Sequence, residues 1–289
     1  MEVPDNFLGI EEEYSNYKNA KVVVLPVAYE GTATYGKGAS KGPKAIIEAS
    51  KQVELYDSET GRNAYDIGIF TLGELKTKET SEKMIEAVYL AVKKEISSNK
   101  FVAMLGGEHS ITAGAVKAFK EKFPDLSVLH IDAHADLREE YEGSKYNHAC
   151  VMMRIFEMKV PFVQVGIRSL CDEEAEFIRN KKIKTFFAHD IHAGRKWIGD
   201  AISSLSKNVY ITFDVDCLDP SIMPATGTPE PGGLGWYDAL ELLKTAAGSK
   251  NIVGFDIVEL APIKGLHFPD FTAAKLASKI IGYCFLNLR

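Results

Sequence analysis

Short apolar runs alternate with amphipathic stretches along most of this chain. The apolar runs, each long enough for one buried strand, cover residues 21–27, 65–70, 101–105, 127–131, 162–166, 184–188, 209–213 and 252–258. The stretches with helical periodicity cover residues 79–98, 111–123, 172–181, 237–247 and 270–283. This alternation predicts an α/β fold in which helices cover both faces of a parallel sheet. Because no linker-like or low-complexity tract interrupts the pattern, we expect a single domain over residues 1–289.

Two of the predicted strands lead into clusters of acidic residues and histidine. One leads into Asp132, His134 and Asp136, which share a face if the strand continues, because strand side chains repeat every second residue. Another leads into Asp214 and Asp216. A single Asp in such a place is more often a turn former or a helix cap, but two such clusters are much rarer. Four close carboxylates carry four negative charges that repel one another, and two divalent cations would neutralise these charges. The pattern therefore predicts a binuclear metal site.

Other strand ends bring further candidates to the same edge, because ligands of parallel sheets bind beyond the carboxyl ends of the strands. His109 follows a Gly-Gly-Glu turn after one strand and is a candidate metal ligand, and Glu259 follows the last strand. His130, in phase with Asp132, is either a support for the metal site or a buried core histidine. The spacing of the remaining histidines along the chain does not assign them to this site. We expect them at surface or structural positions: His189, His192 and His267.

The composition narrows the classes of protein that the chain can belong to. Its 289 residues, 46% of them apolar, suffice for one large core, and the net charge of −6 gives no reason to expect nucleic acid. No apolar stretch is long enough to span a bilayer, and the first residues lack the pattern of a signal peptide. The cysteines form no metal or disulfide motif, which favours buried free thiols: Cys150, Cys171, Cys217 and Cys284. We expect a soluble, cytoplasmic protein.

The glycine-rich segment 31–38 nearly matches a phosphate-binding loop after an apolar strand. Gly38 stands where such a loop needs a hydroxyl for Mg²⁺. Gly42 and Pro43 interrupt the helix that would have to begin there, and Pro43 suits the first turn of a later helix. We therefore expect a mobile loop at the rim of the active site instead of a nucleotide site.

Four motifs stand at or near the strand ends. They read Gly-Gly-Glu-His-Ser, Asp-Ala-His-Ala-Asp, Phe-Asp-Val-Asp-Cys-Leu-Asp-Pro and Ala-Thr-Gly-Thr-Pro-Glu-Pro-Gly-Gly, beginning at residues 106, 132, 213 and 225. Together they resemble the ureohydrolases, the superfamily of arginase, agmatinase and their relatives. The resemblance extends from about residue 20 to the C-terminus. It implies a three-layer α/β/α sandwich with an eight-stranded parallel sheet, two Mn²⁺ ions per chain, and hydrolysis of a guanidino group to urea and an amine. It also implies a homo-oligomer, either a trimer or a hexamer.

The resemblance implies a role for residues of these motifs and of their surroundings. One ion is held by His109, Asp132, Asp136 and Asp214, and the other by Asp132, His134, Asp214 and Asp216. The two residues common to both sets bridge the ions, and this oxygen-rich ligation suits Mn²⁺ better than Zn²⁺. Asp136 and His148 are the expected proton carriers, with His148 near the mouth of the site. Glu259 is expected to hold the guanidinium, and Thr228 to line the pocket.

The substrates of the superfamily differ in the tail beyond the guanidinium. Where arginases have Asn and Ser or Thr, this chain has Glu139, Glu140 and Glu142, which repel a carboxylate and tolerate an ammonium. Cys171 stands where arginases place an Asp against the α-amino group. These features favour agmatine as the substrate, although Arg138 leaves arginine and guanidinobutyrate open.

The expected reaction is hydrolysis of agmatine to putrescine and urea. A guanidinium is a poor electrophile, so we expect attack by a metal-bridging hydroxide, since two cations lower the pKa of a shared water. Within the superfamily, the alternatives are an arginase, a guanidinobutyrase and an aminopropylagmatine ureohydrolase. Outside this activity, the alternatives are an amide hydrolase of the single-zinc deacetylase type and a non-catalytic homologue.

Overall fold

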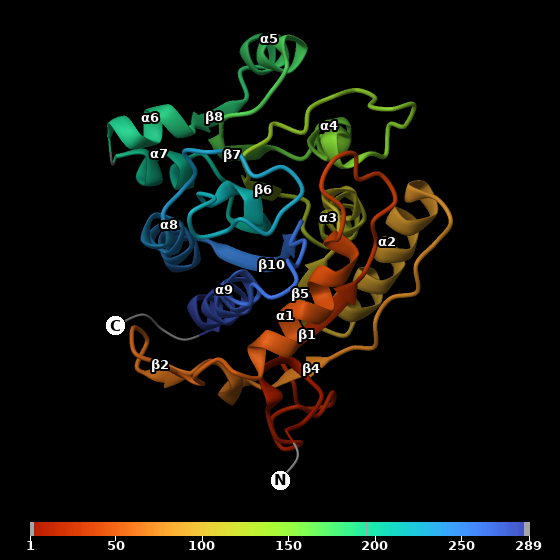
Figure 1. The fold of residues 1–289 in the computed structure, drawn as a ribbon, viewed down its shortest axis with the longest axis vertical. Helices are drawn as coiled ribbons and strands as arrows, with labels where there is room; N and C mark the ends of the chain where they lie inside the picture. Colours follow the sequence, from red (N-terminus) through yellow and green to blue (C-terminus); the bar gives the residue numbers. More distant parts are fainter. Residues whose placement is uncertain (1–2, 195, 286–289) are drawn as a thin grey trace.

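The computed structural model describes residues 3–194 and 196–285 and contains an eight-stranded sheet (Figure 1). In spatial order, its strands are β4 (Ile69–Thr71), β1 (Val22–Val27), β5 (Phe101–Gly106), β10 (Asn251–Val258), β9 (Asn208–Asp214), β6 (Leu126–Ile131), β7 (Phe162–Ile167) and β8 (Lys184–Phe187). Every neighbouring pair in this sheet is parallel. The predicted eight-stranded parallel sheet is therefore confirmed.

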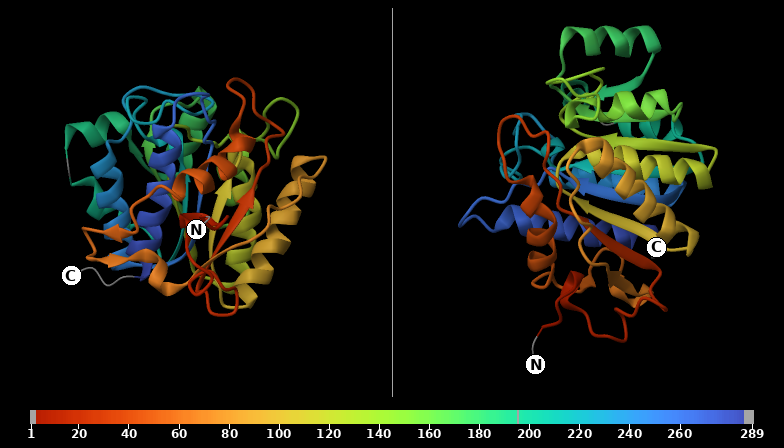
Figure 2. Two further views of the ribbon diagram at one scale, coloured as in Figure 1. Left: turned by 60° about the horizontal axis from the view of Figure 1, so that its bottom comes forward. Right: turned by 90° about the vertical axis from the view of Figure 1, so that its right-hand side faces the viewer.

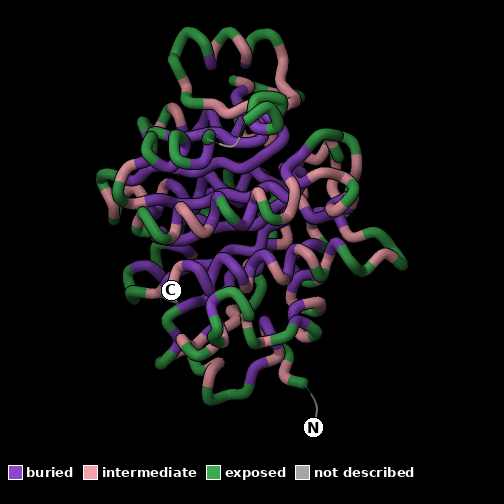
Figure 3. Tube along the Cα trace, turned by 90° about the vertical axis from the view of Figure 1, so that its left-hand side faces the viewer, coloured by how far each residue is buried: buried purple, intermediate pink, exposed green. Residues whose placement is uncertain are grey.

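Helices cover both faces of the sheet and complete a three-layer sandwich (Figures 1 and 2). One layer contains α1 (Gly42–Ser50), α6 (Ala188–Ala193), α7 (Trp197–Ser203), α8 (Trp236–Ser249) and α9 (Phe268–Phe285). The other contains α2 (Ser81–Ser97), α3 (Thr112–Lys122), α4 (Val151–Glu157) and α5 (Asp172–Lys181). In β1, Val22 and Val24 pack into the first core, whereas Val23 and Leu25 pack into the second. Strands buried on both faces explain the continuous apolar runs in the sequence, and the inner strands of the sheet are buried along almost their whole length (Figure 3).

The predicted helices and strands are all present, and the differences lie in short elements. Residues 65–70 form the 3-10 helix η3 (Ala64–Ile67) and then β4, because Gly68 adopts a φ of 79° between them. The apolar pattern did not predict α4, α6 and α7, which are too short to show a helical period. The other elements beyond the pattern are β2 (Tyr56–Asp57), β3 (Arg62–Asn63), η1 (Phe7–Gly9), η2 (Ala39–Lys41), η4 (His109–Ile111), η5 (His148–Cys150) and η6 (Val215–Cys217). Helix α1 has Pro43 in its first turn, as expected.

The order of the central strands brings the candidate residues together. Strands β5, β10, β9 and β6 are consecutive neighbours that run in the same direction, so their carboxyl ends meet at one edge of the sheet. These ends lead into His109, Glu259, Asp214 and Asp132, respectively. Figure 2 shows the loops that follow the strands gathered at this edge. Within the described residues, none of the helices combines the length and apolar composition that a membrane crossing requires.

Candidate metal centre

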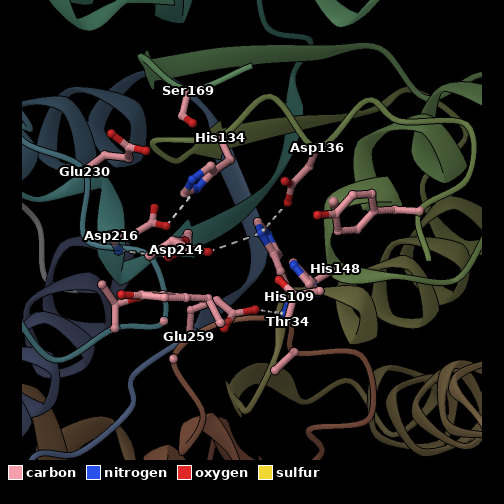
Figure 4. A pocket seen from close by; sticks show the side chains of 18 of the residues that line it. Thr34, His109, His134, Asp136, His148, Ser169, Asp214, Asp216, Glu230 and Glu259 are labelled. Carbon is pink, nitrogen blue, oxygen red and sulfur yellow. Dashed lines mark hydrogen bonds and ion pairs between the residues drawn. The ribbon is translucent and has the colours of Figure 1, made fainter. Parts of the chain in front are cut away.

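His109 lies at the centre of the first of two groups of possible metal ligands (Figure 4). Its Nδ1 atom is 3.1 Å from Asp132 Oδ2, 3.2 Å from Asp136 Oδ2 and 3.5 Å from Asp214 Oδ2. This nitrogen is buried and has no hydrogen-bond partner among the described residues. Neighbouring ligands at right angles around a cation, with bonds of about 2.1 Å, lie about 3 Å apart. A divalent cation therefore fits between His109 and these carboxylates.

The second group surrounds His134. Its Nδ1 atom is 2.9 Å from Asp216 Oδ2 and 3.6 Å from Asp132 Oδ1. Asp132 belongs to both groups, because its Oδ2 faces His109 and its Oδ1 faces His134. Two neighbouring groups that share one carboxylate fit a binuclear metal site.

Loop contacts, and not strand alternation, bring Asp132, His134 and Asp136 together. Strand β6 ends before Asp132, and Asp136 has a φ of 52°, in the left-handed region. A backbone bridge joins His134 to Ser169 after β7. The carbonyl of Asp136 accepts the N–H of Met152 in α4 at 3.0 Å, which holds the unfavourable backbone angle in place. The prediction of an in-phase strand through these residues is therefore wrong, although the three side chains converge.

Buried polar side chains orient the candidate ligands through hydrogen bonds on the side away from the cavity. Thr212 Oγ1 lies 2.8 Å from His109 Nε2 and donates its proton to Asp256 Oδ1 at 2.6 Å. Thr212 therefore accepts the Nε2–H of His109, which leaves Nδ1 as the nitrogen that faces the carboxylates and that a cation can bind in place of a proton. His130 Nε2 lies 2.8 Å from Asp132 Oδ2, so His130 is a buried support for the site. The sequence alone did not identify Thr212 or Asp256 as part of the site. The one feature that could have indicated them is that each is a polar residue inside an apolar strand.

The crowding of negative charge shows in the pKa values of the cluster. Burial, followed by the charges of Asp216 and Asp132, raises the pKa of Asp214 well above its ordinary value of 3.8. Burial opposes protonation of His134, but the charges of Asp216 and Asp132 outweigh it and raise the pKa of the imidazole to about 12. In the metal-free protein, protons thus compensate part of the negative charge. A cation that binds here displaces them.

A cavity of about 250 Å³ opens onto the cluster (Figure 4). Glu259 reaches it from the end of β10 with a φ of 66° and accepts the N–H of His109 at 2.6 Å. Burial, followed by the charge of Glu108, raises the pKa of the Glu259 carboxyl, so a cation in the cavity stabilises its ionised form. Other residues that line the cavity include Arg138, Tyr141, His148, Thr228 and Glu230. Residues 33–36 form part of its wall, at the rim position predicted for the glycine-rich loop.

The acidic loop lies differently from the sequence-based expectation. Its carboxylates are exposed and do not line the cavity: Glu139, Glu140 and Glu142. From the same segment, Arg138 and Tyr141 do line it, with the guanidinium carbon 4.8 Å from the ring centroid. Cys171 borders a smaller adjoining cavity of about 170 Å³. The expectation that these three carboxylates face the substrate is therefore wrong, and Glu139 Oε1 instead lies 3.6 Å from Lys145 Nζ at the surface.

The remaining candidates lie outside the cavity. His189, His192 and His267 are exposed, as expected. All four cysteines are free, and Cys150 and Cys217 are buried. The other two are partly buried, so the prediction of free thiols is confirmed and that of full burial holds for two.

Known proteins share the fold and the sequence around this site. A sequence model of the arginase family matches residues 20–285. The chain belongs to the arginase family. Its relatives there include an N(1)-aminopropylagmatine ureohydrolase from Synechocystis, 41% identical over 288 residues that cover 97% of this chain and 94% of the relative. An agmatinase from Pyrococcus horikoshii is 36% identical over 267 residues, 92% of each chain.

A solved structure of the same family superimposes on almost the whole chain. The agmatine ureohydrolase of Thermoplasma volcanium matches with a TM-score of 0.88 at 33% identity, over 98% of this chain and 95% of that chain. The resemblance to the ureohydrolases is therefore confirmed. As a member of the arginase family, the chain is a hydrolase that acts on guanidino groups.

Metal binding to this arginase-family site is expected to release protons. With pKa values of about 12 for His134 and well above 6.5 for His109, both imidazoles are protonated in the metal-free protein at neutral pH. The apparent affinity for Mn²⁺ should therefore increase with pH, with at least one proton released per chain. Titration calorimetry in buffers of different ionisation enthalpy measures the release. The His189→Asn variant, changed at an exposed histidine, should match the wild type, and binding without proton release would contradict the assignment.

Proposed function

We propose that this arginase-family protein hydrolyses agmatine to putrescine and urea with two Mn²⁺ ions. One observation carries the proposal: a single cavity combines the His/Asp cluster with Glu259 and Glu230. A linear substrate with a guanidinium at one end and an ammonium at the other fits two separate carboxylates. The family membership supports the guanidino end, and the charge of Glu230 supports the amine end.

The proposed ligands divide between the two ions as the motifs suggest. The first set is His109, Asp132, Asp136 and Asp214, and the second is Asp132, His134, Asp214 and Asp216. The unpartnered Nδ1 of His109 and the divided oxygens of Asp132 support this division. Four carboxylates with two imidazoles suit Mn²⁺ better than Zn²⁺. When bound, the two cations supply the Lewis acidity that makes water nucleophilic at neutral pH.

Four side chains of the cavity are proposed to act on the substrate. Glu259 binds the guanidinium, because a carboxylate accepts two parallel hydrogen bonds from this planar cation. Asp136 takes the proton of the attacking water and passes it to the leaving amine as the C–N bond breaks. His148 exchanges protons between the site and solvent near neutral pH. Thr228 contributes a hydroxyl to the cavity wall.

Glu230 is proposed to hold the amine of the tail. Among the described residues, it is the carboxylate that lines the cavity outside the cluster and Glu259. Arg168 fixes its backbone by donating to the Glu230 carbonyl from Nη2 at 2.7 Å and from Nε at 3.3 Å. Arg138 also lines the cavity, but its guanidinium packs on the Tyr141 ring. The loop 226–233 thus takes the role that the sequence assigned to the loop after Asp136.

N1-aminopropylagmatine is a second candidate substrate. The Synechocystis relative carries this substrate in its name. The smaller cavity of about 170 Å³ adjoins the main one and shares His134, Asp136 and Ser169 with it. A longer tail with two amines would use this additional volume.

Removal of metal is expected to abolish urea release. Protein stripped with a chelator should regain activity best with Mn²⁺, and elemental analysis should find two ions per chain. Asp132→Ala and Asp214→Ala should lower metal content most, because each removes a proposed bridge between the ions. Asp200→Ala, at an exposed position, serves as the control. No more than one tightly bound ion at saturating Mn²⁺ would count against the binuclear proposal.

Glu259→Gln is expected to lower kcat/KM for agmatine by about 10²-fold or more, the order for loss of a charge-assisted contact. The amide keeps the shape of the side chain but removes the charge that faces the guanidinium. Metal content should stay at the wild-type value. Glu241→Gln, an exposed position on α8, is the matched control. A variant with wild-type kcat/KM would exclude Glu259 from guanidinium binding.

Side-by-side kcat/KM values for urea release from four guanidino compounds test the substrate assignment. We expect agmatine to exceed arginine and 4-guanidinobutyrate, with N1-aminopropylagmatine as its rival. Glu230→Gln should lower kcat/KM for agmatine about 10-fold or more, because it removes the charge opposite the ammonium. Glu139→Gln should have no effect, since Glu139 is exposed. Higher kcat/KM for arginine would refute the tail assignment but not the guanidino activity.

A further inference from the structure

A chain of hydrogen bonds joins His148 to a buried carboxylate. Thr32 Oγ1 lies 3.2 Å from His148 Nδ1 and 2.8 Å from Glu108 Oε1. The same hydroxyl oxygen accepts the backbone N–H of His148 at 3.1 Å. Thr32 follows β1, Glu108 follows β5, and His148 begins η5, so three distant segments meet at one hydroxyl.

Glu108 is placed to accept hydrogen bonds and not to donate them. It is fully buried. Its carboxylate accepts the N–H of Thr32 at 2.6 Å and the hydroxyl of Ser110 at 2.5 Å, in addition to the Thr32 hydroxyl. Three donors thus converge on its two oxygens, the arrangement of a hydrogen-bond acceptor. Thr32 therefore directs its single hydroxyl proton to Glu108.

This direction decides which nitrogen of His148 carries a proton. A threonine hydroxyl has one proton and two lone pairs. With the proton on the Glu108 side, the lone pairs accept the backbone N–H and the Nδ1–H of His148. Nδ1 then keeps its proton in both the neutral and the charged ring. Nε2 becomes the nitrogen that gains and loses a proton, in a side chain that lines the cavity.

We propose that Thr32, backed by Glu108, is a positioning residue that holds His148 in the Nδ1–H tautomer and confines its proton exchange to Nε2. The inference rests on the proposed function, because it assigns how His148 carries out proton exchange. A carboxylate that acts on an imidazole through a hydroxyl also stabilises the charged ring. The Tyr141 ring packs edge-on against His148, with ring centroids 6.3 Å apart, and supports the same orientation.

Other groups facing the cavity also act on His148, and the experiment has to separate them from Thr32. The charged and titratable side chains that line the cavity together with His148 are Tyr35, His109, His134, Asp136, Arg138, Tyr141, Asp214, Asp216, Glu230 and Glu259, and Glu108 lies behind Thr32. A change at Thr32 alters none of these side chains. An effect of Thr32→Val that Thr32→Ser does not share therefore reports on the hydroxyl and its hydrogen bonds.

Thr32→Val keeps the shape of the side chain but removes the hydroxyl, and Thr32→Ser keeps the hydroxyl. In Thr32→Val, we expect kcat for agmatine to fall about 10-fold with KM within about twofold, as for other supports of a catalytic histidine. The limb of the pH profile that His148→Asn abolishes should move to lower pH, because the charged ring loses stabilisation. Thr32→Ser should restore both values, and Thr77→Val, exposed on a neighbouring surface, should match the wild type.

A second measurement does not depend on turnover. Diethyl pyrocarbonate modifies the neutral imidazole, so the modification rate of the peptide with residue 148, measured by mass spectrometry against pH, gives the pKa of His148 in the manganese-loaded protein. This pKa should be lower in Thr32→Val than in the wild type and normal in Thr32→Ser.

Three results would overturn the inference: an unchanged pKa and pH profile in Thr32→Val, equal damage in Thr32→Ser, or loss of bound metal in Thr32→Val. The third would mean that Thr32 supports the metal centre instead of His148. A wild-type protein that releases no urea from any guanidino compound would overturn the proposed function, and the modification rates would still test how Thr32 holds His148.

Discussion

Repulsion between carboxylates that meet at one edge of the sheet is the constraint on which the rest of this site depends. Asp132, Asp214 and Asp216 are all buried there, and burial and their mutual repulsion raise the pKa of Asp214. Protons on neighbouring histidines or bound cations have to balance this charge. Burying these carboxylates without a compensating positive charge would destabilise the fold. The contacts around them hold the side chains in positions where cations can bind.

Two histidines of the site are oriented by the same device, a hydroxyl between the ring and a buried carboxylate. Thr212 joins His109 Nε2 to Asp256, and the remaining nitrogen, Nδ1, faces the cluster. Thr32 joins His148 Nδ1 to Glu108, and the remaining nitrogen is Nε2. In each case, the hydroxyl gives its proton to the carboxylate and accepts one from the ring. Opposite nitrogens are thereby left for the two tasks that we propose, metal binding by His109 and proton exchange by His148.

Much of the architecture and the position of the site could be predicted from the sequence. The strand β5 appears as an uninterrupted apolar run because helices cover both faces of the sheet. Since parallel strands end at a common edge, the polar residues after β5, β6, β9 and β10 were predicted to share that edge, and the strand order β5-β10-β9-β6 makes them neighbours. Short elements such as α4 escaped prediction, because seven residues hold too little of a helical period.

The sequence by itself determined the strands, the longer covering helices and the ligand-type residues at the strand ends, because apolar periodicity is a local property. Only the tertiary structure decided which side chains face the cavity. Glu139 is exposed and Glu230 lines the cavity, although both occupy polar loops. Likewise, the contact of Thr32 with His148 spans 116 residues, and no local pattern encodes it. The direction of a loop side chain depends on the partners and the water around it, and these exist only once the chain has folded.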